Sequence, residues 1–209
     1  MKFTEAQLES AIIELLGAEG YPHVLGEAIV RQPQEVVIKA DLRAFLTKQY
    51  AAYNITSQEI EAVIKQLEAY SAADLYESNK AIMKLVSDGF LLKREDRSQK
   101  DLYIQLIDYS ELVAFREPKS GEVPTILAEE EAAYGGSRNI FKIVTQLEIV
   151  GYEKRIPDGI LYINGLPLVV FEFKSAIREE DTIHDAFVQL TVRYKRDIPE
   201  LLKYNAFCV

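Results

Sequence analysis

The sequence predicts an α/β fold in which a mixed central sheet is flanked by helices. The first observation is strand-like patterning between positions 139 and 174, where apolar residues alternate with polar ones and then run continuously. The second is amphipathic helical periodicity on either side of that stretch, at positions 4–18 and 182–196. The composition agrees with a globular domain, because 48% of the 209 residues are hydrophobic and 27% are charged.

An amphipathic helix is expected at the beginning of the chain, from Thr4 to Ala18. Thr4 can act as its N-cap, with Gln7 three residues later. The apolar side chains of this segment fall on one helical face: Leu8, Ala11, Ile12, Leu15 and Leu16. We expect this helix to open a core made of about residues 1–30 and 90–209, within a single domain that covers residues 1–209.

A helical insertion is expected at about residues 36–88. One of its helices starts at Ser57 as N-cap, and a later one covers about Tyr76–Ser87. Two short strands follow, Phe90–Leu92 and Leu102–Ile107, on either side of a polar turn.

The helix–strand–turn–strand order over residues 79–108 is also the order of a winged helix, a module that binds DNA or protein. This interpretation predicts a compact unit that a protease separates near Pro118–Pro124. The plainer alternative is a helix that leads into a hairpin of the mixed domain, and both stay open.

The strand-like stretch begins at Asn139, and its alternation predicts one strand that continues to Val150. A hairpin follows, in which Asn164-Gly165 forms the turn and a second strand ends at Lys174. That second strand is apolar on both faces, as expected of a strand covered on both sides. Asp181 is a candidate N-cap for the helix at 182–196. A last strand is expected at 204–209, as a core strand that contains Cys208.

The charge balance argues at first against a nucleic-acid partner, because the chain has a net charge of −9. Residues 1–136 carry 23 acidic and 14 basic side chains, whereas residues 137–209 carry ten of each. The negative excess therefore lies outside the strand-rich part. One cysteine and two histidines exclude an internal disulfide and a cysteine-based metal cluster, and no apolar run approaches the ~20 residues of a membrane span.

The chemically informative residues lie at the ends of the predicted hairpin. Glu172 and Lys174 point to the same face of their strand, because side chains two apart share a face. Asp158 precedes the partner strand, so that the hairpin can place it across from Glu172. Two carboxylates beside a lysine form an oxygen-rich site that suits Mg²⁺. The alternative is a structural ion pair of Glu172 with Lys174 or with Arg155.

These residues resemble the PD-(D/E)xK nuclease core, and more narrowly the N-terminal nuclease region of the type I restriction enzyme R subunit. The stretches that carry the resemblance cover about residues 139–205: N-I-F-K-I-V-T-Q, R-I-P-D-G, N-G-L-P-L-V-V-F-E-F-K and Q-L-T-V-R-Y-K-R-D-I-P-E-L-L-K-Y-N. The opening helix matches the family's first core helix more weakly. The resemblance implies a restriction-endonuclease-like fold and Mg²⁺-dependent hydrolysis of DNA phosphodiester bonds.

By the same resemblance, Asp158 and Glu172 are the expected metal ligands, with the backbone carbonyl of Phe173 as a third. Lys174 would orient or activate the attacking water and stabilise charge on the phosphate. Glu9 matches an acidic position that approaches the metal in this family. A solvent-facing glutamate is the alternative for Glu9.

The helix after the hairpin matches the family's Q-x-x-x-Y motif at Gln189, which implies contacts with nucleic acid. Tyr194 lies one residue later than the motif requires, and on an α-helix it would be turned about 140° away from Gln189. Its expected role as a DNA contact depends on a helix end or bulge. Arg193 and Arg196 fall on the face of Gln189 and are expected to contact phosphates, or else solvent.

The family also implies partners: DNA, the methylase and specificity subunits of a restriction complex, and ATP-driven motor domains further along the same chain. ATP would act only through those domains, because the sequence has no phosphate-binding loop of the G-x-x-x-x-G-K-[ST] type. The expected location is the cytoplasm of a bacterium or archaeon, without membrane attachment. The last strand stops without a turn, which suggests a longer chain, and we expect little or no cleavage by these 209 residues alone. A catalytically silent docking or structural module of the same fold is the alternative.

Overall fold

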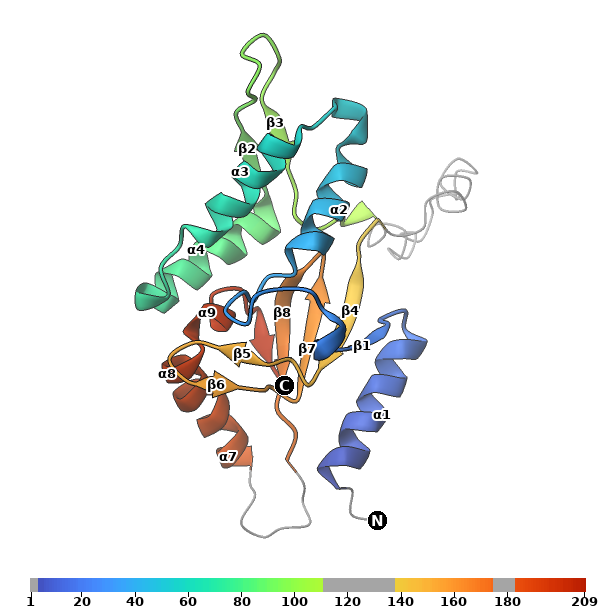
Figure 1. The fold of residues 1–209 in the computed structure, drawn as a ribbon, viewed down its shortest axis with the longest axis vertical. Coiled ribbons are helices and arrows are strands. Elements are labelled where there is room, and N and C mark those ends of the chain that lie inside the picture. Colours follow the sequence, from blue (N-terminus) through green and yellow to red (C-terminus); the bar gives the residue numbers. More distant parts are fainter. Residues whose placement is uncertain (1–3, 111–137, 175–182) are drawn as a thin grey trace, which may run out of the picture.

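A computed structural model describes residues 4–110, 138–174 and 183–209 of the chain. Its centre is a mixed sheet with the strand order β1-β4-β7-β8-β9 (Figure 1). The bounds of these strands are His23–Leu25 for β1, Phe141–Thr145 for β4, Gly159–Ile163 for β7, Leu166–Phe171 for β8 and Phe207–Cys208 for β9. β1 is parallel to β4 and β8 is parallel to β9, whereas β7 is antiparallel to both of its neighbours, β4 and β8. The predicted mixed α/β architecture is confirmed.

The hairpin of β7 and β8 pairs over its whole length, with one register shift between Leu161 and Tyr162. Its turn residues Asn164 and Gly165 have φ angles of 53° and 79°, as a two-residue hairpin turn requires. All six residues of β8 are buried, as expected of a strand covered on both faces. The pairing of Gly159 with Phe171 places Asp158 and Glu172 opposite each other at the open end of the hairpin.

The strand predicted for residues 139–150 is interrupted, so the prediction of one continuous strand is wrong. Gln146 adopts a left-handed conformation with φ of 54°, which ends β4 at Thr145. The apolar residues that follow belong to β5 (Ile149–Val150), which pairs with β6 (Lys154–Arg155) in a separate two-stranded sheet. Both segments bury apolar side chains, so alternation alone could not show the break between them.

Helices lie beside the sheet. α1 (Glu5–Ala18) lies next to β1, and its Thr4–Gln7 capping box is formed as predicted. The C-terminal helices gather near β9 (Figure 1): α7 (Ile183–Val188), a π-helical segment (Gln189–Tyr194), α8 (Lys195–Asp197) and α9 (Pro199–Leu202). The expected N-cap Asp181 lies outside the described residues. Within the described ranges, no helix is long and apolar enough to cross a membrane.

The insertion contains three helices and a hairpin, drawn above the central sheet in Figure 1. Its elements are α2 (Lys39–Gln49), α3 (Ser57–Glu68), α4 (Leu75–Asp88), β2 (Phe90–Leu92) and β3 (Leu102–Ile104). The N-cap of α3 is Thr56, one residue before the predicted Ser57, because its hydroxyl accepts from the backbone of Glu59, whose carboxylate bonds back to Thr56. Single 3₁₀ turns cover residues 26–28, 51–53 and 72–74.

Hydrogen bonds join the insertion directly to the part of the chain that contains the central sheet. The Asn79 side chain donates to three carbonyls at and just after the end of α9, those of Leu202, Lys203 and Asn205. The Tyr204 hydroxyl donates to the carbonyl of Leu67 at 3.2 Å. The β2–β3 hairpin forms its own two-stranded sheet and does not extend the central one. Because this hairpin is separate, the order of three helices and a hairpin is compatible with the winged-helix interpretation. The protease-sensitive boundary that this interpretation expects, at 118–124, lies outside the described residues.

The last strand differs from expectation. β9 is an edge strand of two residues, and Cys208 within it is exposed, not part of the core. Its neighbour Val209 accepts a hydrogen bond at 2.9 Å from the backbone of Glu172. The C-terminal strand therefore supports the backbone at the end of β8.

Candidate functional site

Two carboxylates meet where β7 begins and β8 ends. Asp158 lies directly before β7, and Glu172 directly follows β8. The backbone N–H of Phe173 donates to Oδ2 of Asp158 at 2.6 Å, which fixes the aspartate against the end of the opposite strand. Among the described residues, no donor is hydrogen-bonded to Oδ1 of Asp158. The predicted juxtaposition of Asp158 and Glu172 is present.

Glu172 is buried, and each of its carboxylate oxygens has a partner. Oε1 accepts from the Lys174 ammonium at 2.8 Å, and Oε2 accepts from the Tyr194 hydroxyl at 2.7 Å. The same ammonium donates to the carbonyl of Phe173 at 3.1 Å. The predicted ligands and the predicted lysine thus form one connected group at the end of β8.

The electrostatics of the site favour an added cation. Burial first, and then the charge of Glu172, raise the pKa of Asp158, which reaches about 6 against the opposing effects of the Phe173 N–H and Lys174. Burial works to lower the pKa of Lys174, but its hydrogen bond and attraction to Glu172 outweigh burial and leave that pKa raised. The structure thus holds two acidic groups together with one ammonium as counter-ion.

Tyr194 reaches this group because the helix is not a regular α-helix. Residues Gln189–Tyr194 form a π-helical segment, in which i→i+5 hydrogen bonding brings residues five apart onto one face. The Gln189 side chain is within hydrogen-bonding reach of the Tyr194 hydroxyl. The extra residue between Gln189 and Tyr194 is thus absorbed by a bulge.

Tyr194 is nevertheless placed differently from the expected DNA contact. It is 1% exposed, and its hydroxyl is bonded to Glu172. Burial raises the pKa of Tyr194 and the neighbouring Glu172 charge raises it further, so the hydroxyl stays protonated as a donor. Its position suits a residue that orients Glu172, a role that the spacing alone did not indicate.

The two predicted arginines are engaged in different ways. Arg193 donates to the side-chain carbonyl oxygen of Gln189 at 2.7 Å, close to the carboxylate group. Arg196 and Arg155 both bind Asp197, whose pKa their guanidinium groups lower to about 2, with Arg196 contributing more. Arg155 therefore pairs with Asp197, so that the expected alternative of an Arg155–Glu172 pair is not formed.

The first helix contributes through Glu5. The charge of Glu5 raises the pKa of both Asp158 and Lys174, so the beginning of α1 lies near the site. Glu9 lies one turn later on the same face of α1 and is half-buried. Sequence reasoning missed Glu5, although its spacing of four residues from Glu9 on a helix was a usable signal.

The donor atoms suit a hard divalent cation. Among the described residues, no three histidine, cysteine, aspartate or glutamate side chains come together as a metal cluster. Mg²⁺ does not require one, because it is commonly held by one or two carboxylates together with water and substrate oxygens. Asp158, Glu172 and the Phe173 carbonyl provide three oxygens of that kind.

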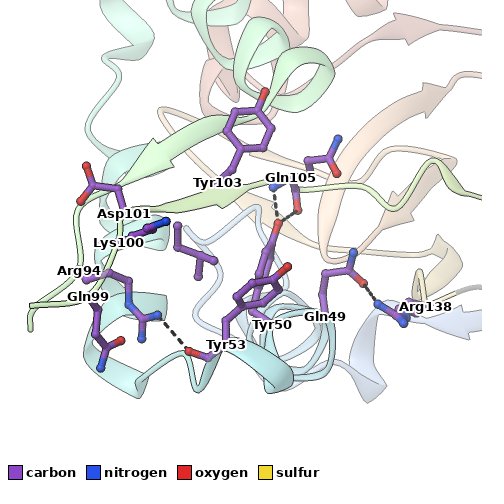
Figure 2. Close-up of a pocket in the computed structure, with 11 residues that line it drawn as sticks. Gln49, Tyr50, Tyr53, Arg94, Gln99, Lys100, Asp101, Tyr103, Gln105 and Arg138 are labelled. Atoms are coloured by element: carbon purple, nitrogen blue, oxygen red, sulfur yellow. Dashed lines mark hydrogen bonds between the residues drawn. The ribbon is translucent and has the colours of Figure 1, made fainter.

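A hollow lies elsewhere, between the insertion and its hairpin (Figure 2). It has a volume of about 800 Å³ and is lined by tyrosines, amides and basic residues. Arg94 in its wall donates to the carbonyl of Tyr53 and pairs with the buried Glu59. No pair of carboxylates lines it, in contrast to the end of β8.

Comparisons with known proteins give the family. Residues 2–209 match the family model "Type I restriction enzyme R protein N terminus". The HindI endonuclease subunit of a type I restriction enzyme from Haemophilus influenzae is 33% identical over 149 residues, which are 70% of this chain and 12% of that protein. Two putative type I restriction enzyme endonuclease subunits from Methanocaldococcus jannaschii, MjaVIIIP and MjaIXP, are 36% and 25% identical over 34% and 97% of this chain. The chain spans less than a fifth of the length of these three relatives. It belongs to the family of type I restriction enzyme R protein N-terminal domains.

Proposed function

We propose that this chain is the nuclease domain of a type I restriction enzyme R subunit and hydrolyses DNA phosphodiester bonds with Mg²⁺. The observation that carries the proposal is the convergence of Asp158, Glu172 and Lys174 at the end of the β7–β8 hairpin. Two carboxylates that can hold the metal, with an ammonium beside them, are the groups that metal-assisted phosphodiester hydrolysis uses.

Each residue of the site has a part in this reaction. Asp158 and Glu172 would hold Mg²⁺ through carboxylate oxygens, together with the Phe173 carbonyl. When bound, Mg²⁺ would offset the negative charge of the phosphate and lower the pKa of a bound water. Lys174 orients the attacking water and stabilises the developing negative charge on the phosphate. Tyr194 keeps Glu172 in its ligating orientation, and Glu9 in α1 stays a weaker candidate for the same site.

The nucleic acid would approach along the helices after β8. Gln189 and Arg193 are the proposed contacts next to the carboxylates, with Arg196 further along. The partners we propose are DNA, the methylase and specificity subunits, and motor domains of the R subunit that use ATP. The proposed location is the cytoplasm of a bacterium or archaeon.

Metal binding tests the site directly. Titration of the 209-residue chain with Mn²⁺ in a calorimeter should show binding that Asp158→Asn and Glu172→Gln each weaken at least tenfold. Glu61→Gln, which removes an exposed carboxylate paired with Arg43, is the matched control and should bind Mn²⁺ as the unaltered chain does. Equal Mn²⁺ affinity in all four proteins would rule out this site.

Cleavage by the isolated chain should be weak or absent, because the family acts within a larger assembly. Efficient Mg²⁺-dependent cutting of plasmid DNA by these 209 residues, abolished by Lys174→Ala, would contradict that expectation while supporting the site.

A silent docking or structural module is the second candidate. It is favoured by the closed group around Glu172, in which Lys174 and Tyr194 satisfy both carboxylate oxygens without a metal. The separate β2–β3 sheet after α4 similarly favours a winged-helix-like binding unit. Absence of Mn²⁺ binding in every variant, including one without Lys174, would favour this second candidate.

A further inference from the structure

The Lys174 ammonium occupies the place where two of the three proposed metal ligands converge. Its Nζ lies 2.8 Å from Oε1 of Glu172 and 3.1 Å from the carbonyl oxygen of Phe173. These are the oxygens assigned to the metal in the proposed function. A protonated lysine is therefore already bound at the point where a divalent cation would bind.

The lysine is the partner of Glu172 that a metal can replace. The other partner, Tyr194, is neutral, buried and bonded to Oε2, so it does not compete for charge. Lys174 sits on a flexible four-carbon stem, and its side chain is 23% exposed, so the ammonium can move towards solvent. Two cations on the same two oxygens would repel each other strongly in a site that burial shields from water.

We propose that Lys174 is the resident counter-ion of the metal-free site and that a divalent cation displaces it from Glu172 and Phe173. This inference rests on the proposed function. Binding of the metal frees the ammonium at the edge of the same site, where the phosphate must lie. The lysine is thus released for its part in hydrolysis only when the metal is in place.

Amine labelling of the unaltered chain tests the displacement without any substitution. Lys174 should react slowly with an acylating reagent in EDTA and at least threefold faster with saturating Mg²⁺, as measured by mass spectrometry. Lys142 is the internal control, because it is paired with Asp41 and is 25% exposed, close to the exposure of Lys174. Its rate should not change with Mg²⁺. An unchanged or slower Lys174 reaction while calorimetry shows bound metal would overturn the inference.

Substitution of the lysine separates this inference from the proposed function. Lys174→Met removes the competitor and should bind Mn²⁺ at least tenfold more tightly than the unaltered chain. Lys195→Met removes an exposed ammonium directly after Tyr194 and should change the affinity less than twofold. Equal affinities of the unaltered chain and a folded Lys174→Met would overturn the displacement and leave the metal site intact. Failure of both proteins to bind Mn²⁺ would instead contradict the proposed function.

Discussion

The negative charge of Asp158 is unfavourable in the metal-free fold. Its pKa is raised to about 6, from an ordinary value of 3.8, first by burial and then by Glu172. A raised pKa means that the folded state holds the proton more tightly than the unfolded chain does. The stability that this proton contributes is complete below about pH 4 and is lost as the pH rises through about 6.

Asp158→Asn should therefore stabilise the metal-free chain above that pH range. In EDTA at about pH 7.5 we expect a gain of about 1 kcal/mol in the free energy of unfolding, allowing for the solvent that reaches a half-buried group. The thermal midpoint should rise by about 2–4 °C. At about pH 4 the two proteins should unfold together, since Asp158 is then protonated.

The matched control is Asp101→Asn, which neutralises an exposed aspartate of the hairpin turn. Asp101→Asn should leave unchanged the difference in the free energy of unfolding between about pH 4 and about pH 7.5. A destabilised Asp158→Asn at the higher pH would show that the Phe173 hydrogen bond outweighs the burial of charge.

Tyr194 is expected to act on metal binding through Glu172. Tyr194→Phe removes the donor to Oε2 and should weaken Mn²⁺ binding by about tenfold, the usual lower limit for losing a partner of a ligand. Tyr162→Phe is the control, because its hydroxyl is equally buried but donates to the carbonyl of Val36, on another side of the sheet. Both substitutions should cost about 1 kcal/mol of stability.

Only Tyr194→Phe should change the affinity for Mn²⁺, as measured by calorimetry at a temperature where both variants are folded. An equal loss of affinity in Tyr162→Phe would assign the effect to general loosening of the fold.

At the scale of elements, the π-helical segment decides how Tyr194 faces the site. Deletion of Val192, an exposed residue within the segment, should turn it into a regular α-helix. The tyrosine would then lie four residues after Gln189, which on an α-helix is the same face. We expect a folded protein with unchanged helix content by circular dichroism and Mn²⁺ affinity within about threefold of the unaltered chain.

A deletion in a regular helix provides the comparison. Removing Gln66 from α3 turns the remaining residues by about 100° and should unfold the insertion. Loss of the fold on deleting Val192 would contradict the interpretation of the π-helix as a single-residue bulge.

The sequence predicted the elements whose side-chain period is unambiguous. The turn at Asn164-Gly165 and the two strands beside it were predicted from their residues, but the exact register was not: a regular ladder from this turn would set Asp158 opposite Phe171, and the register shift between Leu161 and Tyr162 brings it opposite Glu172. The break at Gln146 could not be predicted, because a non-glycine residue with positive φ leaves no mark on apolar alternation.

The contacts of Tyr194 with Glu172 and of Glu5 with the site lay beyond sequence reasoning for a different reason. They join segments far apart in the chain, and their geometry depends on how those segments pack. The odd spacing from Gln189 to Tyr194 indicated an irregularity but not its form.

At the scale of the molecule, the insertion and the central sheet should unfold together. Asn79→Ala removes the donor to three carbonyls at and just after the end of α9 and should cost about 1–3 kcal/mol, since partly buried acceptors then lose their partner. Urea unfolding followed by circular dichroism and by tyrosine fluorescence should give one coincident transition in the unaltered chain. Two separated transitions would show that the insertion is an independent unit, as the winged-helix interpretation expects.

The charge distribution bears on DNA binding by the whole chain. The acidic excess lies in residues 1–136, and the part that carries the site is neutral. Two of the basic groups near it, Arg155 and Arg196, are bound to Asp197. We therefore expect weak, salt-sensitive binding to DNA by the chain alone.

The bulge at Gln189–Tyr194 has a consequence for how related sequences are compared. A search pattern that fixes three residues between the glutamine and the tyrosine would discard this chain, although its tyrosine reaches the carboxylate. An alignment that allows no gap in this helix would shift every residue after the extra one by one position. Relatives should therefore be aligned on the tyrosine as well as on the glutamine, with one helical residue free to be present or absent between them.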